Sequence, residues 1–262
     1  MSASRLITLL TDFGMSDPYA GVMKGIIARI DSDLKVVDIT HGIPPQNLYA
    51  ANFCLLSAYA YFPRGTVHLA VVDPGVGTRR RAIAVELATG FLAGPDNGIF
   101  TGLLDREHVL GAVELTNPGY WRGQRPSSTF HGRDIFAPVA AYLALGTPLN
   151  ELGEKLDPAT LVRLDLPGYA ENDAGISGCI QYIDHFGNLV TNIPGERVEG
   201  SEWSVEAAGT RIPGLKTYGD VPSGTLLALV GSHGFVEISV NGGNACSKLQ
   251  AGLRSEVRVI RK

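Results

Sequence analysis

The alternation of short apolar runs with segments of helical length over residues 5–146 constrains the fold more than any other feature of this sequence. Three runs rich in β-branched residues are separated by two such segments; the runs cover 6–11, 34–40 and 67–72, and the segments cover 19–30 and 47–62. Strands that alternate with helices form parallel sheets with crossover helices on their faces. Two shorter runs, at 82–86 and 91–93, look like a hairpin-like pair. We therefore expect an α/β amino-terminal domain with a mainly parallel sheet.

The pattern changes after a connector that carries prolines and charges. Beyond it, short runs are punctuated by Gly, Pro and Asn, and no helical periodicity exceeds two turns. Six candidate strands follow, at 175–184, 189–193, 203–207, 226–230, 235–240 and 256–260. Such punctuation is typical of a small all-β domain. We place the α/β domain at residues 1–165, a linker at 166–173 and the all-β domain at 174–262.

Composition and charge narrow the class of protein. With 262 residues, of which 45% are hydrophobic, the chain can bury one large core or two modest ones. The formal net charge of -4 supplies no basic field that would attract nucleic acid or anionic lipid. No run reaches the roughly 18 apolar residues of a membrane span, and residues 1–5 lead into a strand-like run without a signal-type stretch. We expect a soluble protein that binds neither nucleic acid nor a membrane.

The cysteines favour a reducing compartment. Cys54, Cys179 and Cys246 are far apart, odd in number and without C-x-x-C spacing, so neither a disulfide framework nor a zinc site is indicated. No His-x-His or His-x-x-x-His spacing supports another metal site. We therefore expect a cytoplasmic protein without a bound metal.

The run 71–80, Val-Val-Asp-Pro-Gly-Val-Gly-Thr-Arg-Arg, places a carboxylate in a glycine-bearing turn at the end of an apolar strand. Ligands of open α/β sheets bind at the carboxyl ends of the strands. Asp73 and Arg80 can form an ion pair that orients a reacting group, and a purely structural ion pair is the alternative. The run lacks the third glycine of the dinucleotide fingerprint and the lysine of a P-loop, so it does not indicate a phosphate cradle.

Two further residues of the amino-terminal region are candidates for chemistry. Asp12 ends the first strand, where its carboxylate can accept hydrogen bonds from the two hydroxyls of a ribose, or can simply cap a turn. His131 lies between a polar loop and a helix start, in Phe-His-Gly-Arg-Asp at 130–134. There it can act as a base, a metal ligand or a plain capping group.

The all-β region carries three polar loops flanked by glycine, at 183–188, 231–235 and 241–245. In the first, Asp184 offers a carboxylate for an ammonium group, Phe186 a ring for stacking and Asn188 an amide for the edge of a base. An ordinary hairpin turn would favour the same asparagine. Together the loops indicate a small polar ligand that contains a ring.

These motifs resemble those of the S-adenosylmethionine hydroxide adenosyltransferases, hydrolases related to fluorinase and chlorinase. The motifs occur in the same order over nearly the full length; they lie at 11–14, 71–80, 130–134, 184–188 and 231–245. The resemblance implies a Rossmann-like α/β domain, a β-barrel-like carboxyl-terminal domain and a homotrimer. It further implies active sites between the amino-terminal domain of one subunit and the carboxyl-terminal domain of its neighbour.

The resemblance also implies a role for each motif residue. It makes Asp73, Arg80 and His131 the catalytic set. The implied substrate-binding residues are Asp12 for the ribose hydroxyls, Asp184, Phe186 and Asn188 for the methionine moiety and adenine, Ser232 for the amino-acid end, and Asn244 and Ala245 in the last loop.

The implied reaction is hydrolysis of S-adenosyl-L-methionine at the ribose C5′ carbon, giving adenosine and L-methionine without a cofactor. The related halogenases carry a tyrosine at the position of Asp73 and a threonine at that of Val76, so this sequence departs from them where halide is held. That departure favours water as the nucleophile. The alternatives are transfer of the adenosyl group to halide, binding of S-adenosylmethionine with little turnover, and a metal-dependent phosphohydrolase that uses the aspartates.

Overall fold

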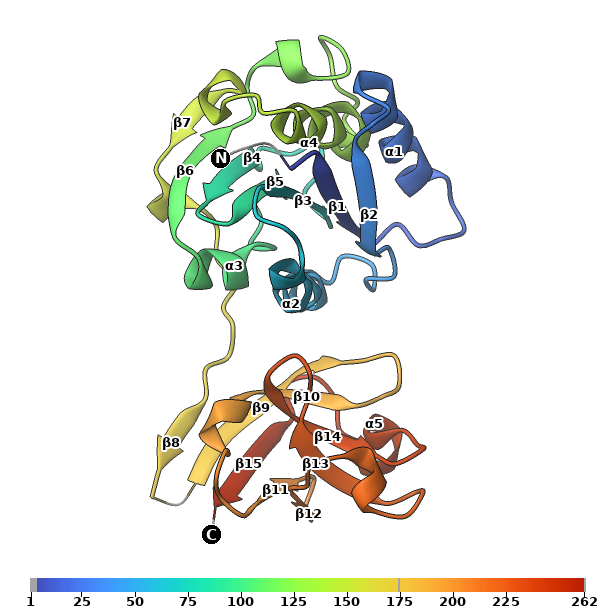
Figure 1. Ribbon diagram of the computed structural model, residues 1–262, viewed down its shortest axis with the longest axis vertical. Helices are drawn as coiled ribbons and strands as arrows, with labels where there is room; N and C mark the ends of the chain where they lie inside the picture. The colour runs from blue at the N-terminus through green and yellow to red at the C-terminus, as the bar shows by residue number, and fades with distance from the viewer. Residues whose placement is uncertain (1–3, 174, 262) are drawn as a thin grey trace. The chain divides into compact units, whose positions relative to one another are not determined.

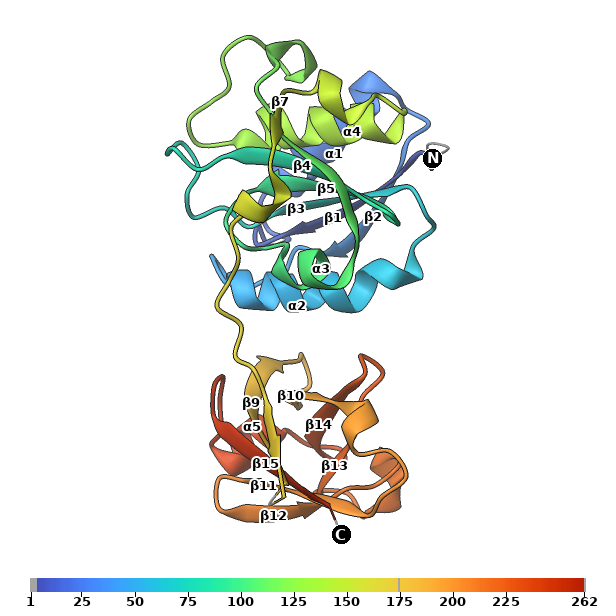
Figure 2. The ribbon, with the colours of Figure 1, turned by 90° about the vertical axis from the view of Figure 1, so that its left-hand side faces the viewer.

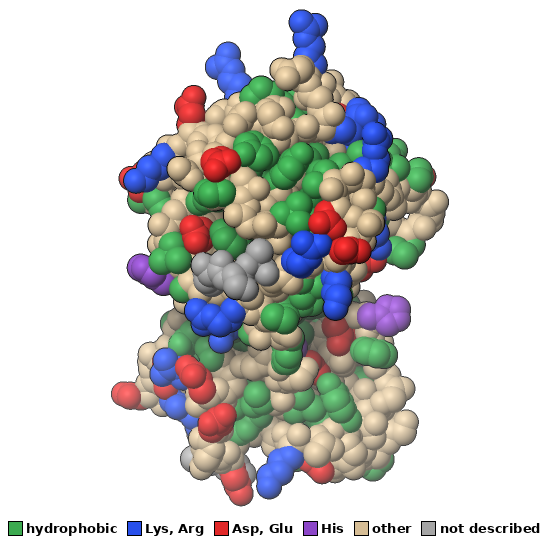
Figure 3. Space-filling model, turned by 45° about the horizontal axis from the view of Figure 1, so that its top comes forward, with side chains coloured by type: hydrophobic (Ala, Val, Ile, Leu, Met, Phe, Trp, Pro, Cys, Tyr) green, Lys and Arg blue, Asp and Glu red, His purple; other side chains and the backbone are tan. Residues whose placement is uncertain are grey.

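The computed structural model describes residues 4–173 and 175–261, which divide into two compact units on either side of the Leu164–Asp165 bond (Figure 1). Residues 170–172, within the expected linker, form strand β8 (Ala170–Asn172), which pairs with β9 of the second unit. None of the helices in the described part of the chain is long and apolar enough to cross a membrane. On the face drawn in Figure 3, acidic and basic side chains are interspersed.

The amino-terminal unit is built on a seven-stranded sheet with the order β2-β1-β3-β5-β4-β6-β7. Its strands are β1 (Leu6–Thr11), β2 (Lys35–Thr40), β3 (Thr66–Val71), β4 (Ala82–Leu87), β5 (Gly90–Pro95), β6 (Val109–Glu114) and β7 (Glu154–Leu156). Only β2, β1, β3 and β5 pair in parallel, whereas β4, β6 and β7 join by antiparallel pairing. The expectation of a mainly parallel sheet therefore holds for one half, and the sheet as a whole is mixed.

The antiparallel pairing of β4 and β5 follows from the short connection between them. Thr89 and its neighbours reverse the chain between β4 and β5, and so short a connection can only join antiparallel strands. The parallel half has longer connections that contain helices. Consecutive strands joined through helices are expected to pair in parallel, as β1 and β2 do.

Helices cover both faces of this sheet (Figure 2). The helices α1 (Tyr19–Ile30) and α4 (Ala137–Ala144) pack together on one face, and α2 (Leu48–Ala58) and α3 (Thr101–Arg106) on the other. A π-helix, Gly132–Phe136, leads into α4. Short 3-10 helices occupy Tyr59–Tyr61, Pro118–Tyr120, Leu149–Glu151 and Pro158–Thr160.

Strand β3 forms the centre of the core. All six of its residues are buried, and Val67, Leu69 and Val71 belong to the main apolar cluster of the unit together with residues of β1 and α4. A strand covered by helices on both faces must be apolar throughout, as its sequence predicts. The loops that follow the parallel strands are thereby held on a rigid base.

The carboxyl-terminal unit is a nearly closed antiparallel barrel, which confirms the expected barrel-like all-β domain. Its strand order is β12-β11-β15-β9-β10-β14-β13, with β8 paired to β9. The strands are β9 (Gly175–Ile183), β10 (Leu189–Pro194), β11 (Trp203–Ala207), β12 (Thr210–Pro213), β13 (Leu226–Val230), β14 (Phe235–Val240) and β15 (Glu256–Arg261). Short helices occupy Gly195–Arg197, Tyr218–Asp220 and α5 (Ala245–Leu249).

One bridge nearly closes the barrel. Gly214, just beyond β12, pairs with Ala228 of β13, and the amide of Leu215 donates to the carbonyl of Ala228 at 2.8 Å. A sheet that curls until its ends meet loses its exposed edges, because each strand then finds a partner on both sides.

The buried His68 predicts a pH-dependent stability of the amino-terminal unit. Its Nδ1 lies 2.9 Å from the Thr8 hydroxyl in the core, and burial lowers the pKa of His68 from 6.5 to about 4. The unfolded chain therefore binds a proton at this histidine before the folded chain does, so stability is lost as the pH falls below 6.5. From pH 7 to pH 5 we expect this group alone to remove about 2 kcal/mol.

Urea unfolding at the two pH values measures the loss. The variant His68→Gln keeps a hydrogen-bonding group for Thr8 but does not titrate. It should lose about 2 kcal/mol less than the unsubstituted protein over the same interval. Equal losses in both proteins would contradict the prediction.

Candidate active site

Parallel pairing brings two of the expected site residues to the same edge of the amino-terminal sheet. Strands β1 and β3 are neighbours, with Thr11 aligned to Val71. Asp12 directly follows the end of β1, and Asp73 follows the end of β3 by two residues. The carboxyl ends of parallel strands lie at one edge, so both carboxylates leave the sheet where α/β folds bind their ligands.

Asp73 and Arg80 form a bidentate ion pair. The Nε of Arg80 donates to Oδ1 of Asp73 at 2.9 Å, and its Nη2 donates to Oδ2. Both side chains are more than nine-tenths buried. The Arg80 guanidinium also lies over the Phe136 ring, 5.2 Å from its centroid. The ion pair suggested by the sequence is therefore present, with both side chains held in one orientation.

His131 joins this pair. The Nη2 of Arg80 lies 3.0 Å from Nδ1 of His131, a residue 51 positions further along the chain. A guanidinium only donates hydrogen bonds, so Nδ1 must be the acceptor, and in the neutral ring the hydrogen is on Nε2. Burial and the nearby charge of Arg80 lower the pKa of His131. The structure thus brings all three expected catalytic residues together and favours a neutral imidazole.

A buried carboxylate fixes the loop that carries His131. Asp134 accepts hydrogen bonds from Nε of Arg122, from the Arg133 side chain and from the backbone amide of Ser127. Although burial raises the pKa of Asp134, these hydrogen bonds lower it well below its ordinary value. Asp134 therefore remains ionised and ties both ends of the polar loop to the helix start.

The Asp73 loop contacts the His131 loop closely at Gly77. This glycine has φ +77°, and a Cβ added there would lie 2.3 Å from the carbonyl oxygen of Ser128. Both the left-handed backbone and the short distance exclude a side chain. Gly77 is thus required for Arg80 and His131 to approach each other.

Asp12 lies on the neighbouring strand end and is half-buried. Its Oδ2 accepts a hydrogen bond from the backbone amide of Gln46 at 2.8 Å. The next residue, Phe13, packs edge-on against the Phe130 ring with the centroids 5.8 Å apart, and Tyr19 contacts both rings. This aromatic cluster connects the Asp12 loop to the His131 loop.

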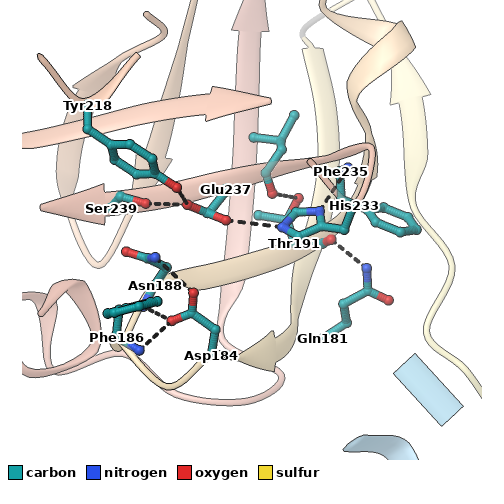
Figure 4. Close-up of polar contacts among 11 residues, drawn as sticks. Gln181, Asp184, Phe186, Asn188, Thr191, Tyr218, His233, Phe235, Glu237 and Ser239 are labelled. Atoms are coloured by element: carbon teal, nitrogen blue, oxygen red, sulfur yellow. Dashed lines mark hydrogen bonds and ion pairs between the residues drawn. The ribbon is translucent and has the colours of Figure 1, made fainter. Parts of the chain in front are cut away.

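In the carboxyl-terminal unit, the Asp184 side chain organises the turn between β9 and β10 (Figure 4). Its Oδ1 accepts from the amides of Phe186 and Asn188 at 2.9 and 2.8 Å, and its Oδ2 accepts from Nδ2 of Asn188 at 2.9 Å. Asn188 therefore has the structural role in a hairpin turn that the sequence left open beside ligand binding. The Phe186 ring is 72% exposed, so the turn presents an aromatic surface to solvent.

The last loop packs against this turn. A Cβ on Gly187 would lie 2.1 Å from Nδ2 of Asn244, and the amide of Cys246 donates to the carbonyl of Gly187. Asn244 also caps α5 through the amide of Ser247 at 2.7 Å, and Ala245 is fully buried. The structure therefore brings Asn244 and Ala245 together with the 184–188 turn.

Ser232 lies on a separate turn, 231–234, between β13 and β14, and is exposed. The following residue, His233, reaches a buried carboxylate at Glu237, which also accepts from the Tyr218 hydroxyl (Figure 4). Burial and the hydrogen bond to Glu237 raise the pKa of Tyr218 to about 12, and the charge of Asp184 contributes. Tyr218 thus lies within electrostatic range of the Asp184 turn.

Sequence reasoning missed several of these residues. One group supports the Asp73 loop: Arg81 pairs with the buried Asp96, and Nδ2 of Asn97 donates to the carbonyl of Val72 at 2.9 Å. Glu237 could have been found, because a charged residue inside an apolar strand requires hydrogen-bonding partners. The cluster of Phe13, Tyr19 and Phe130 was harder to find from the sequence, since single aromatic residues usually belong to the core.

No group of three or more His, Cys, Asp or Glu side chains suited to a metal ion occurs among residues 4–173 and 175–261.

Two family models match most of the chain. The model described as SAM hydroxide adenosyltransferase N-terminal domain matches residues 7–153, and the one described as SAM hydroxide adenosyltransferase C-terminal domain matches residues 178–258. Each model falls within one of the two structural units.

Curated relatives match the chain over three quarters of its length or more. A protein of Salinispora arenicola named (R)-S-adenosyl-L-methionine hydrolase is 42% identical, with 99% of each chain covered. One of Thermus thermophilus with the same name is 42% identical, with 92% of this chain and 94% of the relative covered. A fluorinase of Actinopolyspora mzabensis is 30% identical over 75% of this chain and 74% of its own.

The fold is also found in solved structures. An uncharacterized conserved protein from Thermotoga maritima superposes with a TM-score of 0.92 at 36% identity, covering 97% of this chain and 100% of its own.

The close approach at Gly77 gives a stability prediction. Gly77→Ala should lower the free energy of unfolding by roughly 1–3 kcal/mol, because the methyl group meets the Ser128 carbonyl and the backbone is left-handed. Gly123→Ala is the matched control, since a Cβ at Gly123 would have no atom within 4 Å. Urea unfolding compares the two variants; a Gly77→Ala protein as stable as the control would contradict the close approach.

Proposed function

Because the chain belongs to the S-adenosylmethionine hydroxide adenosyltransferase family, we propose that it hydrolyses S-adenosyl-L-methionine at the ribose C5′ carbon, giving adenosine and L-methionine. The resemblance inferred from the sequence motifs is confirmed by the family models over both units. The observation that carries the mechanism is the contact of Arg80 with both Asp73 and His131. This arrangement places hydrogen-bond donors beside an ion pair at the carboxyl edge of parallel strands.

Hydrolysis of a sulfonium requires little help for the leaving group. The water oxygen forms a bond to C5′ while the C5′–sulfur bond breaks, and the electron pair leaves with sulfur. The sulfonium becomes a neutral thioether, so the leaving group needs no general acid, and the proton of water goes to the solvent. We propose that neither a metal nor an organic cofactor takes part. The remaining difficulty is the weakness of water as a nucleophile.

The donors of the site fit an anionic nucleophile. Arg80 uses Nε–H, both Nη2 hydrogens and one Nη1 hydrogen in its contacts with Asp73, His131 and the carbonyl of Arg81. Among the described contacts one Nη1 hydrogen is left, and His131 presents a hydrogen on Nε2. Both groups donate to an oxygen, which stabilises hydroxide more than water. His131 therefore holds the nucleophile in line with the C5′–sulfur bond and does not take its proton.

Asp73 balances the charge of Arg80. Its two oxygens accept from the guanidinium and hold the planar group in one orientation. An arginine fixed in this way needs no reorganisation when the nucleophile arrives. The tyrosine that halogenases carry at this position could not pair with a guanidinium in the same bidentate way.

The remaining expected residues are proposed to bind the substrate. Asp12, at the edge where Rossmann-like sheets bind nucleosides, would accept from the ribose hydroxyls. The exposed Phe186 ring offers a surface for stacking. The other members of the set are Asp184 and Asn188 for the methionine moiety and adenine, Ser232 for the amino-acid end, and Asn244 and Ala245 in the last loop.

The fluorinase relative makes halide transfer the second candidate. It differs from hydrolysis only in the nucleophile, so the two functions predict different products from the same substrate.

Incubation with S-adenosyl-L-methionine should release adenosine and L-methionine, measured by chromatography. Asp73→Ala should lower the rate by about 10²-fold or more, because Arg80 loses its orientation. Added fluoride or chloride should leave the adenosine yield unchanged. Adenosine no higher than in the Asp73→Ala control would exclude hydrolysis, and 5′-halogenated adenosine would establish the halogenase alternative.

Substitution of the two donor residues should affect turnover more than binding. Arg80→Lys and His131→Gln should lower kcat by about 10²-fold, whereas the dissociation constant measured by calorimetry changes little. Arg79→Lys, at an exposed neighbouring position, should behave like the unsubstituted protein.

The lowered pKa of His131 predicts that kcat/KM falls with acidity only below pH 6.5. Protonation at Nδ1 would remove the acceptor for Arg80 and place two positive charges side by side. An acid limb that persists in His131→Gln would contradict this role.

We further propose that the protein works as a homotrimer whose active sites combine residues of two subunits. Co-expression of Asp73→Ala with Asp184→Ala should then give roughly a quarter of the unsubstituted activity by random mixing, well above the activity of either variant alone. Light scattering gives the oligomeric mass. A monomeric mass, or mixed oligomers without activity, would contradict the proposal.

A further inference from the structure

Glu237 of β14 connects two loops of the carboxyl-terminal unit through its buried carboxylate (Figure 4). Its Oε1 accepts from the hydroxyls of Tyr218 at 2.8 Å and Ser239 at 2.6 Å, and its Oε2 lies 3.0 Å from Nε2 of His233. The side chain is 5% exposed. Although burial raises the pKa of Glu237, the hydrogen bonds from His233, Ser239 and Tyr218 lower it below its ordinary value. The carboxylate is therefore ionised although it is shielded from solvent, on the face of β14 opposite the core residues Val236 and Ile238.

The histidine is held from both sides of its ring. The backbone amide of Phe235 donates to Nδ1 of His233 at 3.2 Å, so Nε2 carries a hydrogen and donates to Glu237. The ring lies over Gly231, where a Cβ would be 2.5 Å from two ring atoms and 3.0 Å from Oε2 of Glu237. The 231–234 turn is thus folded back around the carboxylate, with Ser232 exposed on it.

The second loop is held through Tyr218. This residue begins a short 3-10 helix, Tyr218–Asp220, whose start is fixed by a capping box between Thr217 and Asp220. The Tyr218 ring remains 43% exposed while its hydroxyl reaches the buried Glu237. Glu237 therefore controls the position of two exposed loops at once.

Stability alone does not account for a carboxylate here. The desolvation of a buried charge offsets much of what its hydrogen bonds contribute, so an apolar residue of similar volume would stabilise the barrel as well. A charge that accepts from donors on two loops has a different effect, because it defines where both loops lie.

We propose that Glu237 is a positioning residue for substrate binding, which holds the Ser232 turn and the Tyr218 loop in the arrangement that receives S-adenosyl-L-methionine. The inference rests on the proposed function, in which Ser232 contacts the amino-acid end. It adds a residue that does not touch the substrate but determines where the binding groups are.

The test compares Glu237→Gln with the unsubstituted protein. Glutamine has the same shape but no charge, so whichever way its amide group faces, the charge-assisted hydrogen bonds from His233, Tyr218 and Ser239 are lost or become neutral ones. We expect KM for S-adenosyl-L-methionine to rise about tenfold, the effect of losing one charge-assisted hydrogen bond, while kcat stays within about threefold. The exposed Glu206→Gln in β11 is the matched control and should change neither constant.

A second pair of variants separates positioning from stability and covers the case in which Glu237→Gln does not fold. Tyr218→Phe and Ser239→Ala each remove one donor to the same oxygen, but only Tyr218 belongs to a loop. We expect KM to rise in Tyr218→Phe and to stay unchanged in Ser239→Ala, with thermal unfolding verifying that both are folded. Equal effects of the two on KM would overturn the inference.

The outcomes also separate this inference from the proposed function. An active unsubstituted protein with unchanged KM in folded Glu237→Gln overturns only the role of Glu237. An unsubstituted protein that neither binds nor hydrolyses S-adenosyl-L-methionine overturns the proposed function and the inference that rests on it.

Discussion

The hydrogen bonds that Arg80 donates to Asp73 and His131 connect the glycine-bearing loop after β3 with the loop before α4, where His131 lies 51 positions further along the chain. A guanidinium is planar and cannot accept, so its position defines the orientation of Asp73 and the tautomer of His131 together. The rest of the amino-terminal unit supports this contact. Gly77 lets the two loops approach, and Asp134 holds the start of the π-helix in place.

In both units a carboxylate shielded from solvent holds loops in place. A carboxylate removed from solvent accepts hydrogen bonds from several donors and thereby ties exposed segments to a strand or helix end, as Asp134 does in the first unit and Glu237 in the second. A buried charge tolerates few arrangements, because every lost donor leaves it poorly solvated. Loops held in this way can present binding groups without becoming part of the core.

Prediction from sequence succeeded where one local pattern dominates. The strand 6–11 and the helix 19–30 are observed at those residues, because an apolar run of strand length and a segment of helical length give strong local signals. Strands β6, β7 and β12, at or next to a sheet edge, were missed. Leu110 of β6 is 54% exposed and β7 has three residues, so neither produces a clear periodicity. The hairpin-like pair expected at 82–86 and 91–93 is observed as the antiparallel strands β4 and β5. The antiparallel pairing of β6 and β7 was missed, because pairing direction depends on which strands meet.

The sequence by itself determined the two-part organisation, most of the central strands and the residue types gathered at strand ends, because periodicity and turn chemistry act over short distances. Motif order also determined the family. Only the tertiary structure decided that Arg80 reaches His131, that His131 is neutral with its hydrogen on Nε2, and that Glu237 joins the Tyr218 and Ser232 loops. The physical reason is that these contacts join residues brought together by strand pairing and packing, and no local pattern records which side chains will then lie within hydrogen-bonding distance.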